Sequence, residues 1–457
     1  MDYIIRNAII VNEGALRKAS LYVKDGLIAD IADSIADNGA QVIDAECCYL
    51  LPGIIDTHVH FRDGGDGSNP AGDFYTESRA AAVGGVTSVV DMPNTNPQTT
   101  SFALLQDKKR MAEKKSVVNY GFMVGATNEN IDDILAIPTE QYAAIKLFLG
   151  SSTGNMLVND PERLDYLFEH SKKLIVAHCE EEANIQANMM EYKHLYQGTP
   201  EETAALHPKV RDTAACYVCT YKAIERARKY GTHFHIAHIT SANEVDLLSN
   251  QELGVKNVTA EVTPNHLWFD DRDYAELGNK IKCNPAIKSN NDRMTLWAAL
   301  YDGRIDTIGT DHAPHTKEAK AKPYFDAPSG IPSIQHSLQM MLEPFFNSCT
   351  SNSEREELIK TWLPVLVTKM CHNPATLFGI GRRGFIRQGY HADFVLVNPN
   401  KTTKVTAESL QYKCGWSPLE GSTFHSQISH VFVNGTWVVK EGRLTGESNA
   451  AELTFSN

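Results

Sequence analysis

The chain has 457 residues, of which 42% are hydrophobic and 22% are charged, and its formal net charge is −13. This length accommodates a barrel-sized domain with a smaller satellite domain, and the negative charge argues against nucleic acid or an anionic membrane as a partner. The longest apolar runs have the length of a strand, far below the ~20 residues that a membrane span needs, and the start Met1-Asp2-Tyr3 does not resemble a signal peptide.

Both ends of the chain are predicted to form short strands joined by turns. In segment 1–52 the runs YIIRNAIIV and SLYVKDGLIADI are strand-like, and Lys24-Asp25-Gly26 is typical of a hairpin turn. Segment 381–457 has the same character in HADFVLVNP and HVFVNGTWVVKEGR, where Asn434-Gly435 predicts a second hairpin. We therefore expect the two ends to pair with each other in one small domain that resembles a β-sandwich.

The middle segment, 53–380, alternates strand-like and helix-like runs. The strand-like runs are GIIDTHVHF, GVTSVVDMP, VVNYGFMVGA, YAAIKLFLG, KLIVAHCE, HFHIAHIT, VTAEVTP and IDTIGTDHAP. Helix-like stretches lie between most of them, at 73–85, 100–115, 159–173, 213–231 and 241–254. Eight strands with intervening helices predict a (β/α)8 barrel of the TIM type, whose active sites form at the C-terminal ends of the strands.

Two histidines, His58 and His60, end the first barrel strand. Residues two apart in a strand share a face, so both imidazoles should point into the barrel mouth, which suits a metal such as zinc. An isolated H-x-H is equally consistent with two histidines on a solvated strand face. The same strand-end position recurs, however, at His178, His238 and Asp311. Four histidines and one carboxylate on four strand tips are hard to explain as core packing, so the pattern predicts a metal site.

Lys146 lies within the apolar strand-like run AAIKLFLG, where an unpaired lysine is costly to bury. One interpretation is an ion pair with a nearby carboxylate. The other is a carbamate, because burial lowers the pKa of the amine and a neutral amine can add carbon dioxide. The resulting carboxylate has two oxygens and could bridge two cations. His235 lies on the opposite strand face from His238 and is interpreted as structural or as support for a ligand, while the role of His266 stays open.

The nine cysteines are scattered, odd in number and without framework spacing: Cys47, Cys48, Cys179, Cys216, Cys219, Cys283, Cys349, Cys371 and Cys414. Together with the absence of a secretion signal, this favours reduced thiols and a cytoplasmic location. The one C-x-x-C, Cys216 to Cys219, lacks a second pair and lies in a helical apolar pattern, so it is predicted to pack in the core.

The H-x-H, the strand lysine, the two further strand-end histidines and the late aspartate together resemble the signature of the amidohydrolase superfamily. The runs DTHVHFR, DMPNT, IKLFLG, AHCE, HIAH, EVTPNHL, NPAIK and TDHAPH are similar to the dihydroorotases within it, and the likeness spans nearly the whole chain. This resemblance implies reversible hydrolysis of (S)-dihydroorotate to N-carbamoyl-L-aspartate in pyrimidine synthesis. The alternatives are an allantoinase, a hydantoinase of the dihydropyrimidinase type, or a non-catalytic relative, although such relatives typically lose ligands and every position here is filled.

The resemblance also implies two divalent metal ions per chain, zinc in the first place. One ion would be held by His58, His60, Asp311 and a carbamylated Lys146. The same lysine and a hydroxide would bridge to a second ion, held by His178 and His238. The hydroxide would be the nucleophile, and Asp311 would deliver its proton to the leaving ring nitrogen.

Five residues are implied to bind the substrate: Arg62, Asn94, Asn284, His315 and Gly330. The planar guanidinium of Arg62 matches a carboxylate, which a hydantoin would not supply. The alternative for Arg62 is a surface ion pair with Asp63 or Asp66. We therefore expect a small-molecule substrate that bears a carboxylate, no nucleic-acid or membrane partner, and a homodimer as the candidate assembly.

Overall fold

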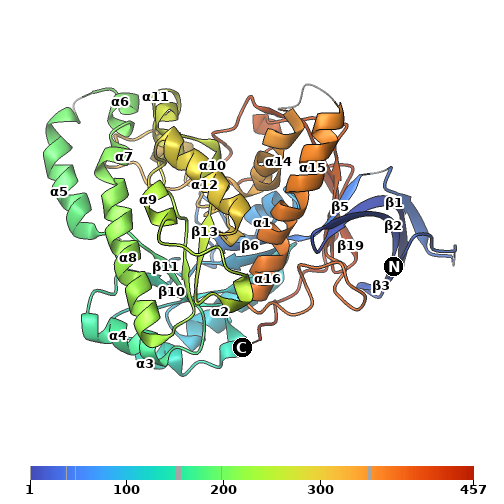
Figure 1. Ribbon diagram of the computed structural model, residues 1–457, viewed down its shortest axis with the longest axis horizontal. Coiled ribbons are helices and arrows are strands. Elements are labelled where there is room, and N and C mark those ends of the chain that lie inside the picture. The colour runs from blue at the N-terminus through green and yellow to red at the C-terminus, as the bar shows by residue number, and fades with distance from the viewer. Residues whose placement is uncertain are drawn as a thin grey trace.

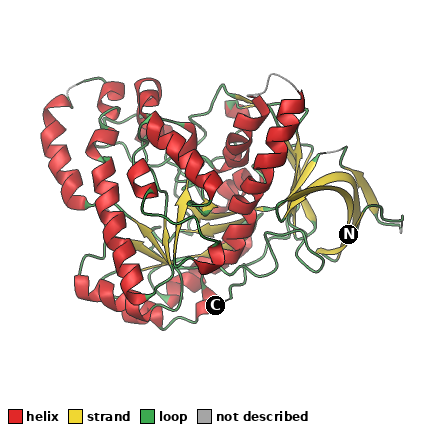
Figure 2. Ribbon diagram, viewed as in Figure 1, coloured by secondary structure: helices red, strands yellow, loops and turns green. Residues whose placement is uncertain are grey.

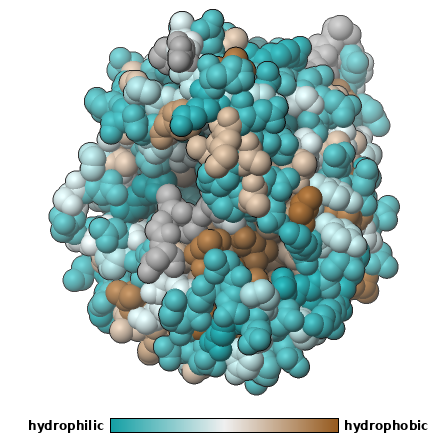
Figure 3. Space-filling model, turned by 90° about the vertical axis from the view of Figure 1, so that its left-hand side faces the viewer, coloured by the Kyte–Doolittle hydropathy of each residue, from teal (hydrophilic) through white to brown (hydrophobic). Residues whose placement is uncertain are grey.

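A computed structural model of the chain describes residues 2–37, 39–46, 48–150, 156–196, 198–347 and 352–456. It consists of a barrel wrapped by helices and a smaller β-rich part beside it (Figure 1). The N-terminus lies in the β-rich part and the C-terminus lies at the barrel (Figure 2). No helix in the described ranges is long and apolar enough to cross a membrane. The face drawn in Figure 3 is mostly hydrophilic, with a smaller apolar area near its centre.

The β-rich part is one nine-stranded sheet to which both ends of the chain contribute. Across the sheet the strands are β20 (Arg443–Leu444), β19 (Thr436–Lys440), β18 (Gln427–Val433), β15 (Phe394–Asn398), β5 (Tyr49–Pro52), β1 (Tyr3–Asn12), β2 (Ala15–Lys24) and β3 (Leu27–Ala32), with β4 (Gln41–Asp44) paired to β1. β15 runs antiparallel to β5, with Phe394 opposite Pro52. The pairing of the two chain ends is confirmed, while the exact domain boundaries at 52 and 380 stay predictions.

Both predicted hairpin turns form, and their tips meet. Asp25 and Gly26 have φ of +51° and +78°, and Asn434 and Gly435 have φ of +49° and +73°, the left-handed values that a tight two-residue turn requires. A Cβ on Gly26 would lie 2.9 Å from the carbonyl oxygen of Asn434. Glycine is therefore needed at position 26 both for its φ and for the close approach of the second hairpin.

The barrel is a ring of parallel strands. Its strands are β6 (Ile54–Val59), β7 (Val86–Asp91), β8 (Asn119–Phe122), β9 (Val124–Gly125), β10 (Ile145–Phe148), β11 (Ile175–His178), β12 (Phe234–Ile236), β13 (Val258–Val262) and β14 (Thr307–Ile308). β6 to β8 form one sheet and β9 to β14 another, and β8 continues into β9 after a single residue. The ring closes where Val59 bridges to His312 and the amide of His60 donates to the carbonyl of His312 at 2.8 Å. The (β/α)8 barrel is confirmed.

Helices cover the outside of the barrel. They are α1 (Phe74–Val83), α2 (Phe102–Lys115), α3 (Ile131–Leu135), α4 (Pro161–His170), α5 (Glu182–Tyr192), α6 (Pro200–Ala204), α7 (His207–Val210), α8 (Thr213–Tyr230), α9 (Ala242–Val245), α10 (Pro264–Trp268), α11 (Tyr274–Leu277), α12 (Asn290–Asp302), α13 (Lys317–Lys320), α14 (Ser337–Asn347), α15 (Asn352–Val367) and α16 (Asn373–Leu377). The expected helix over 241–254 is reduced to α9. Ser241 and Glu244 form a capping box that starts it, but the weak helix formers Ser249 and Asn250 follow.

Two pieces of the segment 381–457 leave the β-rich part and contact the barrel. Near the C-terminus, Leu453 donates its amide to the carbonyl of Tyr120 at 2.8 Å, and Phe455 packs in one apolar cluster with Val90 and Val176 of the barrel strands. The second piece, 411–416, reaches the barrel mouth. The C-terminal segment therefore serves both parts of the molecule.

The cysteines in the described ranges are buried and free of disulfides: Cys48, Cys179, Cys216, Cys219, Cys283, Cys371 and Cys414. Cys47 and Cys349 lie outside the described residues. Cys216 and Cys219 lie on the buried face of α8, in agreement with the predicted core packing.

Candidate active site

One cavity of about 230 Å³ lies at the C-terminal ends of the barrel strands, and it brings together every residue that the sequence singled out as a site residue. The predicted metal ligands on its wall are His58, His60, Lys146, His178, His238 and Asp311. The predicted substrate residues on its wall are Arg62, Asn94, Asn284, His315 and Gly330. Phe148, Ala313, Pro328 and Ser329 also line it. The role of each residue stays a prediction.

A first cluster of metal-ligating side chains is formed by His58, His60 and Asp311. Asp311 Oδ1 lies 3.0 Å from His60 Nε2 and 3.3 Å from His58 Nε2. On the other side of its ring, His58 Nδ1 lies 2.6 Å from Glu261 Oε1, so Nδ1 is the nitrogen that carries the proton. The lone pair of His58 Nε2 therefore faces an oxygen of Asp311, an arrangement that needs a cation or a proton between them. This cluster fits a metal ion.

A second cluster lies next to the first. His178 Nδ1 is 3.1 Å from His238 Nε2, and the rings of His238 and His58 are 5.3 Å apart. Among the described residues, His238 Nδ1 and His60 Nδ1 are buried without a hydrogen-bond partner. Burial lowers the pKa of His60 to about 4 and also lowers the pKa values of His178 and His238. Neutral imidazoles keep the lone pair that a metal needs, so this pair fits a second ion.

The protonation of Asp311 follows from its neighbours. Burial by itself would raise the pKa of this carboxyl, but the adjacent His58 and His60 outweigh burial and hold the pKa well below its usual range. Asp311 is therefore a carboxylate at neutral pH, which is the form that binds a cation.

Lys146 lies on β10 with a side chain that is 1% exposed. Its Nζ is 5.2 Å from the ring centre of Phe148, and no carboxylate of the described residues forms an ion pair with it. Burial lowers the pKa of Lys146 to about 8, although Asp311 and Glu261 oppose that shift. The ion-pair interpretation of this lysine thus lacks a partner in the described ranges, and part of the amine population is neutral near physiological pH.

Two carboxylates that support the histidines were missed by the sequence reasoning. Glu261 on β13 holds His58, as described above. Glu180 Oε2 lies 2.9 Å from His178 Nε2, outside hydrogen-bond alignment, and forms an ion pair with Arg211. Burial would raise the pKa of Glu180, but Arg211 and His178 outweigh it and lower the pKa to about 2. Their position in the sequence could have identified them, because both glutamates lie at or just beyond the C-terminal end of a predicted barrel strand.

Three non-glycine residues of the cavity have a left-handed backbone. Their φ values are +61° for Arg62, +39° for His238 and +47° for Asp311. This conformation costs ~1–3 kcal/mol at each residue and persists only where surrounding contacts enforce it. Backbone strain in this cavity therefore falls on two predicted metal ligands, His238 and Asp311, and on Arg62, the arginine predicted to bind the substrate.

Arg62 is held by its neighbours without a carboxylate. Its Nε donates to the carbonyl of Pro314 at 2.9 Å, and its Nη2 lies 3.1 Å from His315 Nε2. Burial, followed by the charge of Arg62, lowers the pKa of His315 to about 2, so this imidazole is neutral.

The ion pair of Arg62 with Asp63 or Asp66 does not form. Asp63 pairs with Lys115, whose Nζ lies 2.8 Å away, and Asp66 accepts hydrogen bonds from Ser68. The surface ion-pair interpretation of Arg62 is therefore excluded, and its guanidinium lines the cavity.

The part of the cavity wall next to His315 is a loop held by polar contacts. Ser329 donates its hydroxyl to Asn284 Oδ1 at 3.0 Å, and its carbonyl lies 3.0 Å from His315 Nε2. Gly330 has φ of +141°, and a Cβ there would lie 2.4 Å from the carbonyl oxygen of Ala313. Only glycine allows the loop to approach the strand end this closely.

The two histidines whose roles were uncertain do not line the cavity. His235 Nδ1 lies 2.8 Å from Thr259 Oγ1 inside the barrel. His266 Nδ1 lies 2.7 Å from Thr263 Oγ1, and its Nε2 lies 3.1 Å from the carbonyl of Pro285. Both are buried and hydrogen-bonded within the barrel, so their roles stay predictions.

Comparison with known proteins agrees with this geometry. The model of the amidohydrolase family matches residues 49–438. The chain belongs to the amidohydrolase family. It is 30% identical to a dihydroorotase of Methanosphaera stadtmanae over 408 residues, covering 89% of each chain. It is 28% identical to an allantoinase of Escherichia coli, covering 95% of this chain and 94% of that one.

A solved structure extends the likeness to the fold. The L-hydantoinase (dihydropyrimidinase) of Arthrobacter aurescens superposes with a TM-score of 0.89, at 27% sequence identity and with 99% of each chain covered. These relatives share cyclic amides as substrates, so this amidohydrolase is a cyclic-amide hydrolase. They differ in the ring that their names specify, which leaves the substrate to be argued from the cavity.

Proposed function

We propose that this amidohydrolase catalyses the reversible hydrolysis of (S)-dihydroorotate to N-carbamoyl-L-aspartate. The observation that carries the proposal is Arg62, a partly buried guanidinium on the cavity wall that no carboxylate of the described residues neutralises. A carboxylate on the ring substrate supplies the missing charge, and the planar fork can form two parallel hydrogen bonds with it. Hydantoin, dihydrouracil and allantoin carry no carboxylate for this position.

Two further buried lysines support an acidic substrate. Lys320 donates to the carbonyls of Gly330 and Pro328 at 2.9 and 3.0 Å, and Lys282 donates to the carbonyls of Tyr324 and Ala327 at 2.6 Å each. Neither lysine forms an ion pair with a carboxylate in the described ranges. Burial lowers the pKa of Lys282 to about 8 and that of Lys320 to about 7, so the protonated fractions of these two lysines add positive charge behind the loop of Gly330, although the whole chain has a net charge of −13. A local excess of one charge raises the local concentration of a ligand of the opposite charge.

Two divalent ions, zinc in the first place, would be held by the two clusters. His58, His60 and Asp311 would bind one ion, and His178 and His238 the other, with Lys146 as a carbamate between them. When bound, such ions polarise the scissile carbonyl and lower the pKa of water. Among the chain's own residues, Asp311 would hold a proton on its carboxylate and pass it to the leaving ring nitrogen. Arg62 would orient the substrate through its carboxylate.

A panel of substrates tests the proposal. Turnover of dihydroorotate, allantoin, hydantoin and dihydrouracil is measured on the purified protein, together with its metal content by elemental analysis. We expect the highest kcat/KM for dihydroorotate and about two ions per chain, by the count of ligands. Faster turnover of hydantoin or allantoin would overturn the substrate assignment, and fewer than one ion per chain in active protein would overturn the two-ion site.

A further inference from the structure

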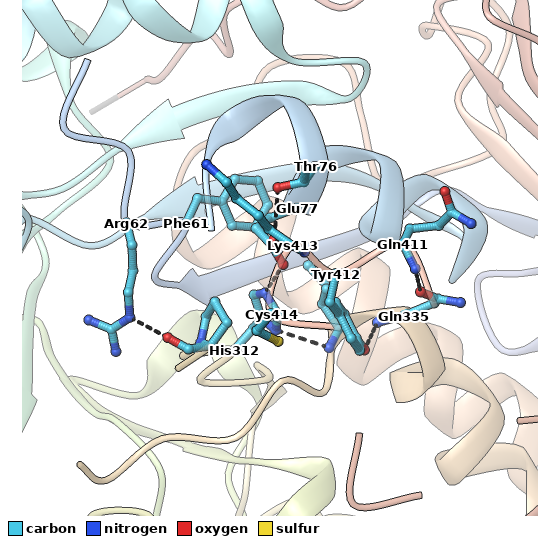
Figure 4. Close-up of polar contacts among 12 residues, drawn as sticks. Phe61, Arg62, Thr76, Glu77, His312, Gln335, Gln411, Tyr412, Lys413 and Cys414 are labelled. Carbon is cyan, nitrogen blue, oxygen red and sulfur yellow. Dashed lines mark hydrogen bonds and ion pairs between the residues drawn. The ribbon is translucent and has the colours of Figure 1, made fainter. Parts of the chain in front are cut away.

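A buried imidazole directly follows the predicted ligand Asp311. His312 and Glu77 are both 0% exposed, and His312 Nε2 lies 2.9 Å from Glu77 Oε2 (Figure 4). The other ring nitrogen, Nδ1, accepts a hydrogen bond from the amide of Ser333 at 3.1 Å. A backbone N–H can only donate, so Nδ1 is the acceptor and Nε2 carries the proton. His312 therefore donates to the carboxylate of Glu77, and its tautomer is determined by these two contacts.

The carboxylate of Glu77 is required by its other contacts as well. Its Oε1 accepts from the amide of Lys413 at 3.0 Å and from the hydroxyl of Thr76 at 2.9 Å. Glu77 also lies in the first turn of α1, where the helix dipole favours a negative charge. All these partners offer hydrogens to the two oxygens. An amide at this position would direct its own NH2 group at one of the donors.

The segment 411–416, which we call the strap, covers this pair. The ring of Tyr412 stacks on the ring of His312, with 5.3 Å between centroids and 29° between planes. Trp416 Nε1 donates to the carbonyl of His315 at 2.7 Å. The strap thus contacts His312 and His315, two members of the stretch 311–315, and it covers the buried pair of His312 and Glu77.

The backbone of His312 connects the pair to two predicted ligands. Its carbonyl accepts from the amide of His60 at 2.8 Å, and its amide donates to the hydroxyl of Thr310 at 3.0 Å. Asp311 lies between Thr310 and His312 with φ of +47°, a left-handed conformation that is uncommon for a residue other than glycine. The neighbours on either side of Asp311 are therefore held by hydrogen bonds, which enforces the strained residue between them.

We infer that Glu77 and His312 are positioning residues of this amidohydrolase. Their buried hydrogen bond holds Asp311 and His60 at the spacing that one metal ion requires. The inference rests on the metal site proposed above. It assigns to Glu77 and His312 no contact with the substrate or with the reacting atoms.

Four variants test the inference. His312→Leu removes both hydrogen bonds of the imidazole, and Glu77→Gln keeps the shape of the side chain but mismatches its donors. His312→Gln keeps one donor for Glu77 and one acceptor, so it should recover much of what the leucine loses. The matched control is His372→Leu, which removes another buried histidine. His372 bonds to the carbonyl of Gly384 and the amide of Glu13 and does not line the cavity.

The experiment measures metal binding, with no substrate present. Each protein is stripped with a chelator and titrated with Co²⁺, whose visible absorption reports the number and geometry of its ligands, and its thermal unfolding is recorded in parallel. We expect His312→Leu and Glu77→Gln to bind Co²⁺ about 10- to 100-fold more weakly, the range typical for loss of a group that orients a ligand. The cobalt affinity of His312→Gln should be much closer to that of the unaltered protein. His372→Leu should lower the Tm without changing the cobalt affinity.

The outcomes separate the inference from the proposed function. Cobalt affinities and spectra of His312→Leu and Glu77→Gln that match those of His372→Leu would overturn the inference alone, and so would a His312→Gln variant no better than the leucine. If His312→Leu does not fold, the near-isosteric Glu77→Gln decides by the same two measurements. Failure of the unaltered protein to bind Co²⁺ would overturn the proposed metal site and the inference with it.

Discussion

Replacing Arg62 by methionine removes the guanidinium and keeps most of the aliphatic stem. If the substrate carboxylate accepts two charge-assisted hydrogen bonds from Arg62, each contributes ~1.5–3 kcal/mol, so ~3–6 kcal/mol is lost. That corresponds to a fall in kcat/KM of about 10²- to 10⁴-fold. We expect the lower part of this range, because the protonated fractions of Lys282 and Lys320, which lie behind the loop of Gly330, still attract an acidic substrate after the substitution.

The assay compares two substrates on the same variant. For Arg62→Met, kcat/KM should fall strongly with dihydroorotate and only slightly with a neutral cyclic amide such as hydantoin, which the enzyme would turn over slowly. Arg62→Lys keeps the charge without the planar fork, so its loss with dihydroorotate should be intermediate. The metal content should not change, because Arg62 contacts Pro314 and His315 and none of the predicted ligands.

Equal losses with both substrates, at full metal content, would refute the reasoning. Arg62 would then serve to hold the strand end through its bonds to Pro314 and His315. A Tm that falls strongly in both Arg62→Met and Arg62→Lys would point to the same structural role.

Three further predictions concern other parts of the site. Lys146→Ala should lose metal and activity, and an excess of a small carboxylate such as acetate should partly restore both. An intact mass of the active enzyme that shows Lys146 without a carbamate would contradict this prediction. Gly330→Ala should raise KM more than it lowers kcat, because the new Cβ would lie 2.4 Å from the carbonyl of Ala313, and unchanged kinetics would show that the loop moves freely. The pKa of Glu180 is lowered from its usual 4.5 to about 2 in the folded protein. Its carboxylate therefore stabilises the fold fully above pH 4.5, and this stabilisation is lost as the pH falls through about 2. The free energy of unfolding by urea should therefore be lower for Glu180→Gln than for the unaltered protein at pH 7, and this difference should narrow below pH 4.5. A difference in unfolding free energy that does not depend on pH would contradict the lowered pKa of Glu180.

The sequence alone indicated the barrel strands and their order, because strands depend on local periodicity, whereas it predicted only five of the helices and overextended the one at 241–254. His58 and His60 share a strand face since side chains alternate in a strand, and the barrel was readable from eight strand-like runs. Asp25-Gly26 and Asn434-Gly435 predicted their turns because few residues adopt a positive φ. The position of polar residues at strand ends then sufficed to collect the candidate site, since parallel strands of a barrel end at one mouth.

Only the tertiary structure decided which side chains support the site, because those contacts join residues that are far apart in the sequence. His58 and Glu261 are separated by 203 positions, and Glu77 and Lys413 by 336. No local pattern encodes such a pair, since Glu261 and Glu77 taken alone are ordinary residues of a strand and a helix, and Lys413 lies in a turn. Arg62 could bind a substrate carboxylate or pair with Asp63 or Asp66, and the choice depended on where these two aspartates point. The direction of a side chain is determined by packing that brings distant segments together.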